Sequence, residues 1–109
     1  MKDLERAPLG RNGVEITRLG LGSAPLGGLF TPVSDTDAEA TIARAWDLGV
    51  RYFDTAPLYG FGSAERRMGA VLRHKPRDSF VLSSKVGRLL RRRDRPPRED
   101  RLYKDTPEE

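Results

Sequence analysis

Two amphipathic helical segments, each flanked by short apolar segments, constrain the fold of this chain more than any other feature of its sequence. The first spans residues 34–49; it begins with Ser34, a residue type favoured at helix N-caps, and ends at Gly49. The second spans residues 63–72, and we expect Ser63 to cap it. Apolar side chains recur at the spacing of one helix face, namely Ala38, Ile42, Ala45 and Trp46 in the first segment and Ala64, Met68, Val71 and Leu72 in the second. Both segments are therefore predicted to be helices that bury one face.

Three segments of strand character alternate with these helices, and they span residues 19–24, 50–56 and 80–86. Neighbouring parallel strands need a crossover connection, which helices supply, so this order predicts an α/β fold with two βαβ units and a parallel sheet. Residues 7–18 are predicted to form a hairpin, because Asn12 and Gly13 tolerate the positive φ angles of a tight turn. Glycines and prolines in residues 25–33 predict a loop that lets the backbone approach a ligand closely.

The length and composition indicate an ordered part followed by a polar tail. The chain has 109 residues, well short of the roughly 250 of a complete (β/α)8 barrel. Hydrophobic residues make up 37% and charged residues 33%, and residues 88–109 show no periodicity. We therefore expect residues 88–109 to be a flexible basic loop or a disordered tail. The absence of cysteine excludes disulfides and thiolate zinc sites, and we expect no metal site.

The net charge of +4 raises the question of a nucleic-acid or membrane partner. Residues 1–87 carry 12 basic and 10 acidic side chains, and residues 88–109 carry 8 and 6, so the positive charge is spread along the chain. Five arginines lie between Arg88 and Arg95, but Asp94 interrupts them and no aromatic residue stands among them for base stacking. We predict a solvated, flexible tail and no nucleic-acid partner. The first ten residues lack an apolar run, so we expect neither a leader nor a membrane anchor, and a soluble cytoplasmic protein.

Three polar side chains stand where a parallel α/β sheet places its active site, at the carboxyl ends of strands. Alternation along the strands puts Asp54 and Lys85 on faces that can meet at one edge, where opposite charges neutralise one another. Tyr59 follows five residues after Asp54 and could lean over this pair. A free tyrosine has a pKa of about 10, so a proton-donor role needs a nearby cation such as the ammonium of Lys85. The pattern predicts an acid/base site for carbonyl and alcohol chemistry.

Each of these residues also has a purely structural interpretation. Asp54 could cap the following turn, Tyr59 could be a packed loop aromatic, and Lys85 could end an exposed strand. The single histidine, His74, stands at the end of the second predicted helix, away from the strand ends, where a cation complements the helix dipole. We interpret His74 as a structural residue.

Four segments together resemble the aldo-keto reductases. They are Leu19-Gly20-Leu21-Gly22, Tyr52-Phe53-Asp54-Thr55-Ala56-Pro57-Leu58-Tyr59-Gly60, Ser63-Ala64-Glu65 and Leu82-Ser83-Ser84-Lys85-Val86-Gly87. The stretches 22–29 and 85–90 look most like the branch that contains D-threo-aldose 1-dehydrogenase, L-fucose dehydrogenase and pyridoxal 4-dehydrogenase. The resemblance implies that residues 1–87 are the N-terminal part of a (β/α)8 TIM barrel, with a hairpin, about three strands and two helices.

The resemblance also implies an activity, a cofactor and roles for site residues. The expected activity is hydride transfer between NADP or NAD and a small-molecule carbonyl or sugar, with Tyr59 as general acid/base, Lys85 tuning it and Asp54 orienting Lys85. Ser23 and Asp54 match positions near the nicotinamide. The family's fourth catalytic residue, a histidine after the next strand, has no counterpart in these 109 residues. The alternative is therefore a catalytically incomplete fragment without activity of its own. The substrate, the choice between NAD and NADP and the oligomeric state stay open.

Overall fold

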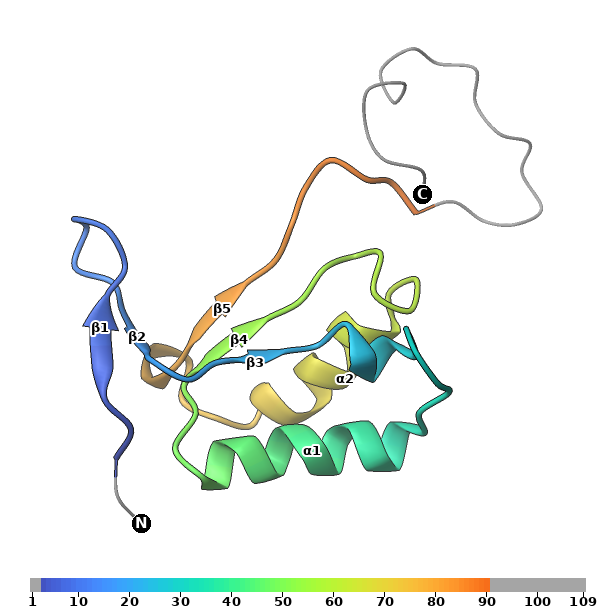
Figure 1. The fold of residues 1–109 in the computed structure, drawn as a ribbon, viewed down its shortest axis with the longest axis horizontal. Helices are drawn as coiled ribbons and strands as arrows, with labels where there is room; N and C mark the ends of the chain where they lie inside the picture. Colours follow the sequence, from blue (N-terminus) through green and yellow to red (C-terminus); the bar gives the residue numbers. More distant parts are fainter. Residues whose placement is uncertain (1–2, 91–109) are drawn as a thin grey trace.

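The computed structural model describes residues 3–90. The chain begins with an antiparallel hairpin of β1 (Arg6–Pro8) and β2 (Glu15–Thr17), in which Ala7 pairs with Ile16. The turn between them contains Gly10 and Gly13, both at positive φ. The predicted hairpin is therefore confirmed, but Gly10 and not Asn12 shares the positive φ with Gly13. The hairpin lies at the amino-terminal end of the sheet that follows, away from the loops at the carboxyl ends of the strands (Figure 1).

A three-stranded parallel sheet forms the centre of the fold. Its strands are β3 (Leu21–Gly22), β4 (Tyr52–Asp54) and β5 (Val81–Ser83), in the order β3-β4-β5. The register aligns Gly22 with Asp54 and Asp54 with Ser83, so the three strands end level with one another. The predicted parallel sheet is confirmed, but all three strands are shorter than the segments predicted over residues 19–24, 50–56 and 80–86. The ladder of β4 and β5 ends where the N–H of Thr55 donates to the carbonyl of Ser83, since β4 turns into a loop there.

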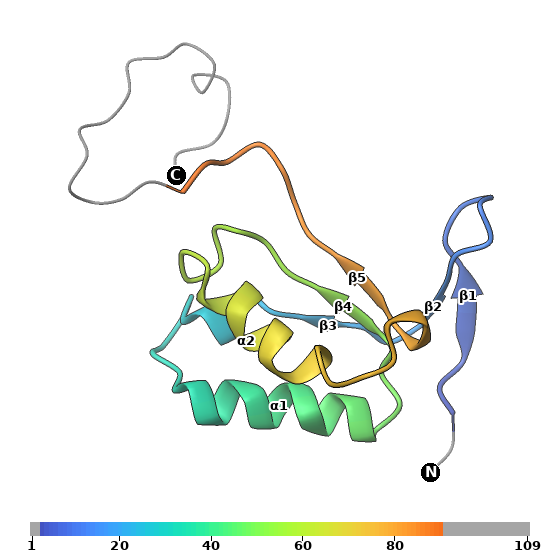
Figure 2. The ribbon, with the colours of Figure 1, turned by 180° about the vertical axis from the view of Figure 1, so that it is seen from behind.

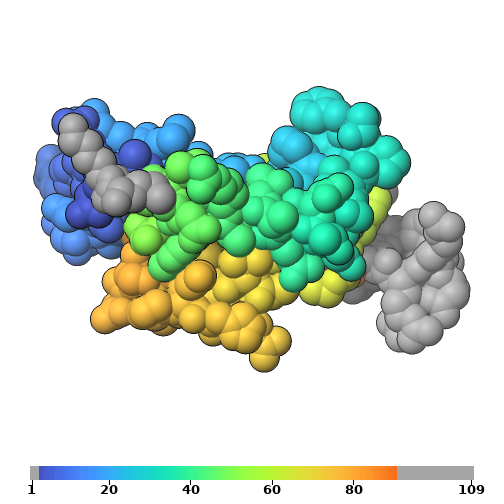
Figure 3. Space-filling model, turned by 90° about the horizontal axis from the view of Figure 1, so that it is seen from below, coloured from blue at the N-terminus to red at the C-terminus, as the bar shows by residue number. Residues whose placement is uncertain are grey.

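The helices pack side by side on one face of this sheet (Figures 1 and 2). Helix α1 (Asp35–Asp47) and helix α2 (Ser63–Leu72) also form adjoining parts of the surface in the space-filling view (Figure 3). Two short 3-10 turns, η1 (Pro25–Gly27) and η2 (Arg77–Ser79), stand in the connections. The predicted N-cap of α1 is confirmed, because the hydroxyl of Ser34 accepts a hydrogen bond from the N–H of Asp37 at 3.0 Å.

The predicted N-cap of α2 is wrong. Ser63 is the first helical residue, and Gly62 holds the cap position with φ of +96° and no side-chain hydrogen bond. A glycine is suited to this left-handed backbone because it has no Cβ. Gly62 holds the cap position because its carbonyl accepts the first helical hydrogen bond, from the N–H of Arg66, at 3.1 Å.

The hydrophobic core fills the space between the sheet and the two helices. Its fully buried members come from the predicted helix faces and from the centre of β4: Ala38, Ile42, Phe53, Ala64 and Met68. Phe53 packs against the rings of Trp46 and Phe80, with centroids 6.3 Å away in each case. Alternation then turns the neighbours of Phe53 in β4 to the opposite face of the sheet. Among residues 3–90, no helix is long and apolar enough to cross a membrane.

Candidate active site at the carboxyl end of the sheet

Asp54 and Lys85 form an ion pair at the carboxyl edge of the sheet. The ammonium of Lys85 donates to Oδ2 of Asp54 at 2.8 Å and to the carbonyl oxygen of Thr55 at 3.0 Å. Asp54 ends β4, whereas Lys85 stands two residues beyond β5 and reaches back to it. Two acceptors therefore fix the amine over the end of β4, and the predicted proximity of the two charges is present in the structure.

Two hydroxyl groups that the sequence analysis did not single out as site residues complete this arrangement. The hydroxyl of Ser83 donates to Oδ1 of Asp54 at 2.6 Å, and the hydroxyl of Tyr52 lies 3.1 Å from Oγ of Ser83. Because Ser83 has a single proton and gives it to Asp54, the Tyr52 hydroxyl is the donor to Ser83. Strand alternation puts Tyr52 and Asp54 on one face of β4, so the sequence held a signal for this network.

The network shifts the pKa values of both charged groups. Burial raises the pKa of Asp54, but hydrogen bonds from Lys85 and Ser83 and the charge of Lys85 outweigh it, and the pKa lies below its ordinary value. The hydrogen bond to Asp54 raises the pKa of Lys85; partial burial opposes this shift, and the neighbouring Tyr59 adds to it. Asp54 is therefore held as a carboxylate and Lys85 as an ammonium.

We expect this ion pair to persist across an unusually wide pH range. Asp54 has a depressed folded-state pKa, so its contribution is complete above the ordinary value of 3.8 and is lost as the pH falls through the lower folded-state value. Lys85 has a raised folded-state pKa, so its contribution is complete below 10.5 and is lost as the pH rises through the higher value. The two side chains are 35% and 47% exposed, and we expect the pair to stabilise the fold by less than about 1 kcal/mol.

NMR titration of the Asp54 carboxyl carbon and the Lys85 ammonium measures both transitions. In Lys85→Met, the Asp54 transition should move up toward its ordinary value. Titration of both wild-type groups at their ordinary values would contradict the ion pair.

Tyr59 is held by a tight loop between β4 and α2. Its N–H donates to the carbonyl of Ala56 at 3.2 Å, and its carbonyl accepts from the N–H of Ala64 in the first turn of α2, at 3.1 Å. The next residue, Gly60, has φ of +63°, and a Cβ there would lie 2.8 Å from the Cα of Gly27. Only glycine fits this position, because a side chain would meet both backbone strain and a neighbouring backbone. The backbone on both sides of Tyr59 is thereby fixed.

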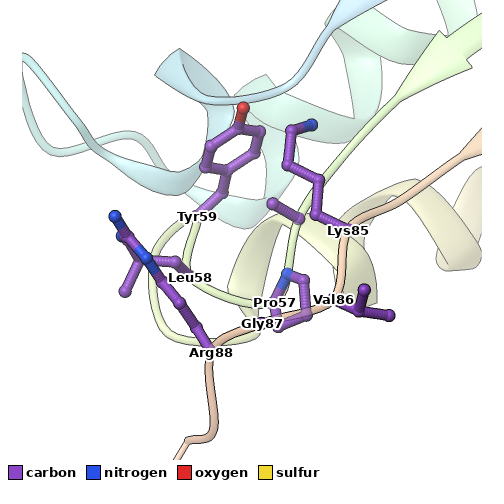
Figure 4. Close-up of a pocket in the computed structure, with 8 residues that line it drawn as sticks. Pro57, Leu58, Tyr59, Lys85, Val86, Gly87 and Arg88 are labelled. Atoms are coloured by element: carbon purple, nitrogen blue, oxygen red, sulfur yellow. The ribbon is translucent and has the colours of Figure 1, made fainter. Parts of the chain in front are cut away.

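The phenol of Tyr59 and the amine of Lys85 border the same hollow. The Lys85 ammonium lies 5.1 Å from the centroid of the Tyr59 ring, within the range of a cation–π contact. Figure 4 shows both side chains projecting from facing loops toward the same side. The hollow has a volume of about 350 Å³ and is lined by Ala56, Pro57, Leu58, Tyr59, Lys85, Val86, Gly87 and Arg88. The amine and the phenol therefore border a space large enough for a small organic molecule, and the carboxylate of Asp54 reaches it through Lys85.

Two other residues from the sequence analysis take different places. Ser23 is fully buried, and both its N–H and its hydroxyl donate to the carbonyl of Asp54, at 3.1 and 2.9 Å. It joins the ends of β3 and β4, and its predicted contact with a cofactor stays a prediction. His74 is exposed just after α2, outside the hollow. Within residues 3–90, no group of three or more potential ligands from His, Cys, Asp and Glu could hold a metal ion.

Comparison with known proteins shows the family of the chain. A sequence model described as the Aldo/keto reductase family matches residues 18–106. The chain belongs to the aldo/keto reductase family. The structure is accordingly the N-terminal part of an aldo-keto reductase (β/α)8 barrel, as the sequence predicted. The predicted boundary between residues 1–87 and 88–109 stays a prediction, because residues 91–109 lie outside the described residues.

Relatives within this family match the chain over most of its length. A pyridoxal 4-dehydrogenase from Microbacterium luteolum is 53% identical over 90 residues, which are 83% of this chain and 26% of the relative. A D-threo-aldose 1-dehydrogenase from a Pseudomonas species is 56% identical over 79 residues, which are 72% and 24%. An aldo-keto reductase from Bacillus halodurans, solved in its holo form, superposes with a TM-score of 0.68 at 31% identity, covering 77% of this chain and 26% of its own. This aldo-keto reductase chain thus spans about a quarter of the length of these relatives.

Proposed function

We propose that this aldo-keto reductase segment supplies the proton-transfer groups of a nicotinamide-dependent oxidoreductase. The observation that carries the proposal is the convergence of the Asp54 carboxylate, the Lys85 ammonium and the Tyr59 phenol at one edge of a parallel sheet. General acid/base chemistry on a carbonyl needs a proton donor whose conjugate base is stabilised. A phenol beside a fixed ammonium meets that requirement.

The steps of the chain's own residues follow from this geometry. In reduction, the hydroxyl of Tyr59 donates its proton to the carbonyl oxygen of the substrate, and the Lys85 ammonium stabilises the phenolate that remains. In oxidation, the phenolate takes the proton of the substrate hydroxyl. Asp54 keeps Lys85 charged and pointed at this position, through the 2.8 Å hydrogen bond. Ser83 in turn fixes the carboxylate of Asp54, because it donates to the oxygen that Lys85 does not use.

The described residues fit a nicotinamide cofactor at this edge. A Cβ added to Gly22 would meet no atom within 4 Å, so the backbone at the end of β3 is open to a ligand. Asp54 is 35% exposed beside it, whereas Ser23 is fully buried and holds this edge through its hydrogen bond to the carbonyl of Asp54. We assign Asp54 to the nicotinamide end of NADP or NAD, and Ser23 to the support of Asp54 there. When bound, the cofactor supplies or accepts the hydride.

The substrate class is an aldose or another small alcohol or carbonyl compound. The relatives named for D-threo-aldose and pyridoxal oxidation, at 56% and 53% identity, support this class for the present chain. The hollow beside Tyr59, at about 350 Å³, has the size of a small-molecule site. Because each match covers about a quarter of the relative, we assign to this segment the acid/base groups and not the whole binding site.

Two measurements test the proposal, on the full protein that carries this sequence and on residues 1–109 alone. The first is titration with NADPH and with NADH, followed by cofactor fluorescence. The second is turnover of D-aldoses and pyridoxal, followed by formation of the reduced nicotinamide. We expect saturable binding and turnover for the full protein. Saturation without turnover on any alcohol or carbonyl would contradict the proposed function. If the full protein turns over substrate and residues 1–109 alone neither bind cofactor nor turn over substrate, then residues 1–109 alone are a catalytically incomplete fragment.

A further inference from the structure

Arg67 of helix α2 binds the loop that connects β3 to α1. Its side chain is 12% exposed and makes three interactions across this loop. Nη1 donates to the carbonyl of Leu26, Nη2 donates to the carbonyl of Val33 at 2.9 Å, and Nε donates to the carboxylate of Asp35 at 2.7 Å. The guanidinium therefore closes both ends of the segment between Leu26 and Asp35.

The loop of residues 26–35 is in direct contact with the backbone of Tyr59. A Cβ added to Gly27 would lie 2.6 Å from the carbonyl carbon of Tyr59 and 2.6 Å from the nitrogen of Gly60. Such distances leave no room for a side chain, so the two loops meet backbone to backbone. Gly27 immediately follows Leu26, whose carbonyl accepts from Arg67. A displacement of this loop is therefore transmitted to the residue that carries the phenol.

Side chains in the middle of this loop are largely exposed. Leu29 and Phe30 are 64% and 79% exposed, so their side chains provide little burial there. Leu26 is buried, so the start of the loop is held by packing. The guanidinium of Arg67 adds directed hydrogen bonds, because its N–H donors are fixed in one plane. Lysine could keep the charge opposite Asp35 but could not reach two carbonyls and a carboxylate with a planar fork.

We propose that Arg67 is a positioning residue for Tyr59, which it serves by holding residues 26–35 against the Tyr59 backbone. This inference rests on the proposed function, because it concerns the rate of the step that Tyr59 performs. Small misplacements of a catalytic group lower kcat strongly, and a shift of about 1 Å can cost 10²-fold. Removal of the Arg67 side chain should therefore lower kcat more than it weakens cofactor binding.

The test compares Arg67→Ala and Arg67→Lys with Arg66→Ala in the full protein. Arg66 is the matched control, since its side chain is 69% exposed and approaches Asp35 only to 3.9 Å. Rates are expressed per cofactor-binding site, counted by NADPH fluorescence, so that loss of folded protein does not enter kcat. We expect kcat to fall about 10-fold or more in both Arg67 variants, with the KM for cofactor nearly unchanged. Arg66→Ala should match the wild type, and added guanidinium ion should restore part of the rate of Arg67→Ala.

The result separates this inference from the proposed function. If the wild-type protein shows no turnover, the proposed function is contradicted, independently of the Arg67 variants. Active wild-type protein with unchanged kcat per site in Arg67→Lys would overturn the positioning role. So would a fall in kcat that guanidinium ion does not relieve and that Arg66→Ala shares. If Arg67→Ala does not fold, Arg67→Lys still tests the positioning role. It keeps the positive charge near Asp35 and removes the planar guanidinium that binds the two carbonyls.

Discussion

Tyr59→Phe is expected to lower kcat by about 10²–10⁴-fold, because it removes one hydroxyl group that donates and accepts the proton. The ring stays the same size, so the contact of Tyr59 with the Lys85 ammonium at 5.1 Å should remain. The loop is held by backbone hydrogen bonds from Tyr59 to Ala56 and from Ala64 to Tyr59, which the substitution leaves intact. We therefore expect cofactor titration and thermal melting to change little while turnover falls.

Tyr52→Phe is the matched control for this experiment. Its hydroxyl belongs to the same network, but it contacts Ser83, and Tyr52 is not among the residues that line the hollow. We expect its loss to lower kcat less than tenfold, since it removes one neutral hydrogen bond worth about 1 kcal/mol. Equal effects of the two substitutions, or full activity of Tyr59→Phe, would contradict the assignment of Tyr59 as the acid/base.

Lys85→Met is expected to lower kcat by about 10²–10³-fold, the size of effect seen when one preorganised electrostatic contact to developing charge is removed. The substitution keeps a side chain of similar length and deletes the ammonium that contacts both Asp54 and Tyr59. Its effect on stability should be small, because the Lys85 side chain is 47% exposed and surface ion pairs contribute less than about 1 kcal/mol. A large loss of rate with a small loss of stability is thus the expected signature.

Lys75→Met provides the control for the loss of a lysine. The Lys75 ammonium lies 5.2 Å from the ring of Trp46, which packs with the core on the helix-covered face of the sheet. Steady-state kinetics and thermal unfolding on both variants measure the comparison. We expect wild-type kcat for Lys75→Met. A loss of rate in Lys85→Met that is matched by a loss of folded protein would show that Lys85 is only structural.

Periodicity was sufficient to predict the layers of this fold. Spacing of 3.6 residues identified the faces of α1 and α2, and the fully buried residues Ala38, Ile42, Ala64 and Met68 lie on those faces. Alternation turned Asp54 to the face of β4 opposite Phe53, whereas its pairing with Ser83 comes from the register of the structure. The helix and strand faces could be predicted because each depends on residues close together in sequence.

Features that depend on the path of a loop were harder to predict. Ser63 is a residue type favoured at N-caps, but the first helical hydrogen bond runs from Arg66 to the carbonyl of Gly62, so Gly62 holds the cap. The alternation rule ends with β5 at Ser83, so it could not fix the direction of Lys85, which lies in the following loop. Arg67 donates to the carbonyls of Val33 and Leu26, which are 34 and 41 residues away in sequence. No local sequence pattern predicts contacts over such a separation.

The central claim is that the amine of Lys85 acts on the phenol of Tyr59, and a double-mutant cycle on kcat measures this directly. The cycle compares Tyr59→Phe, Lys85→Met and the double variant in the full protein, each corrected for the number of cofactor-binding sites. Groups that act as a unit have strongly non-additive effects, so we predict that the double variant is no slower than Tyr59→Phe alone. Multiplicative losses, with the double variant slower by the product of the single effects, would contradict the account.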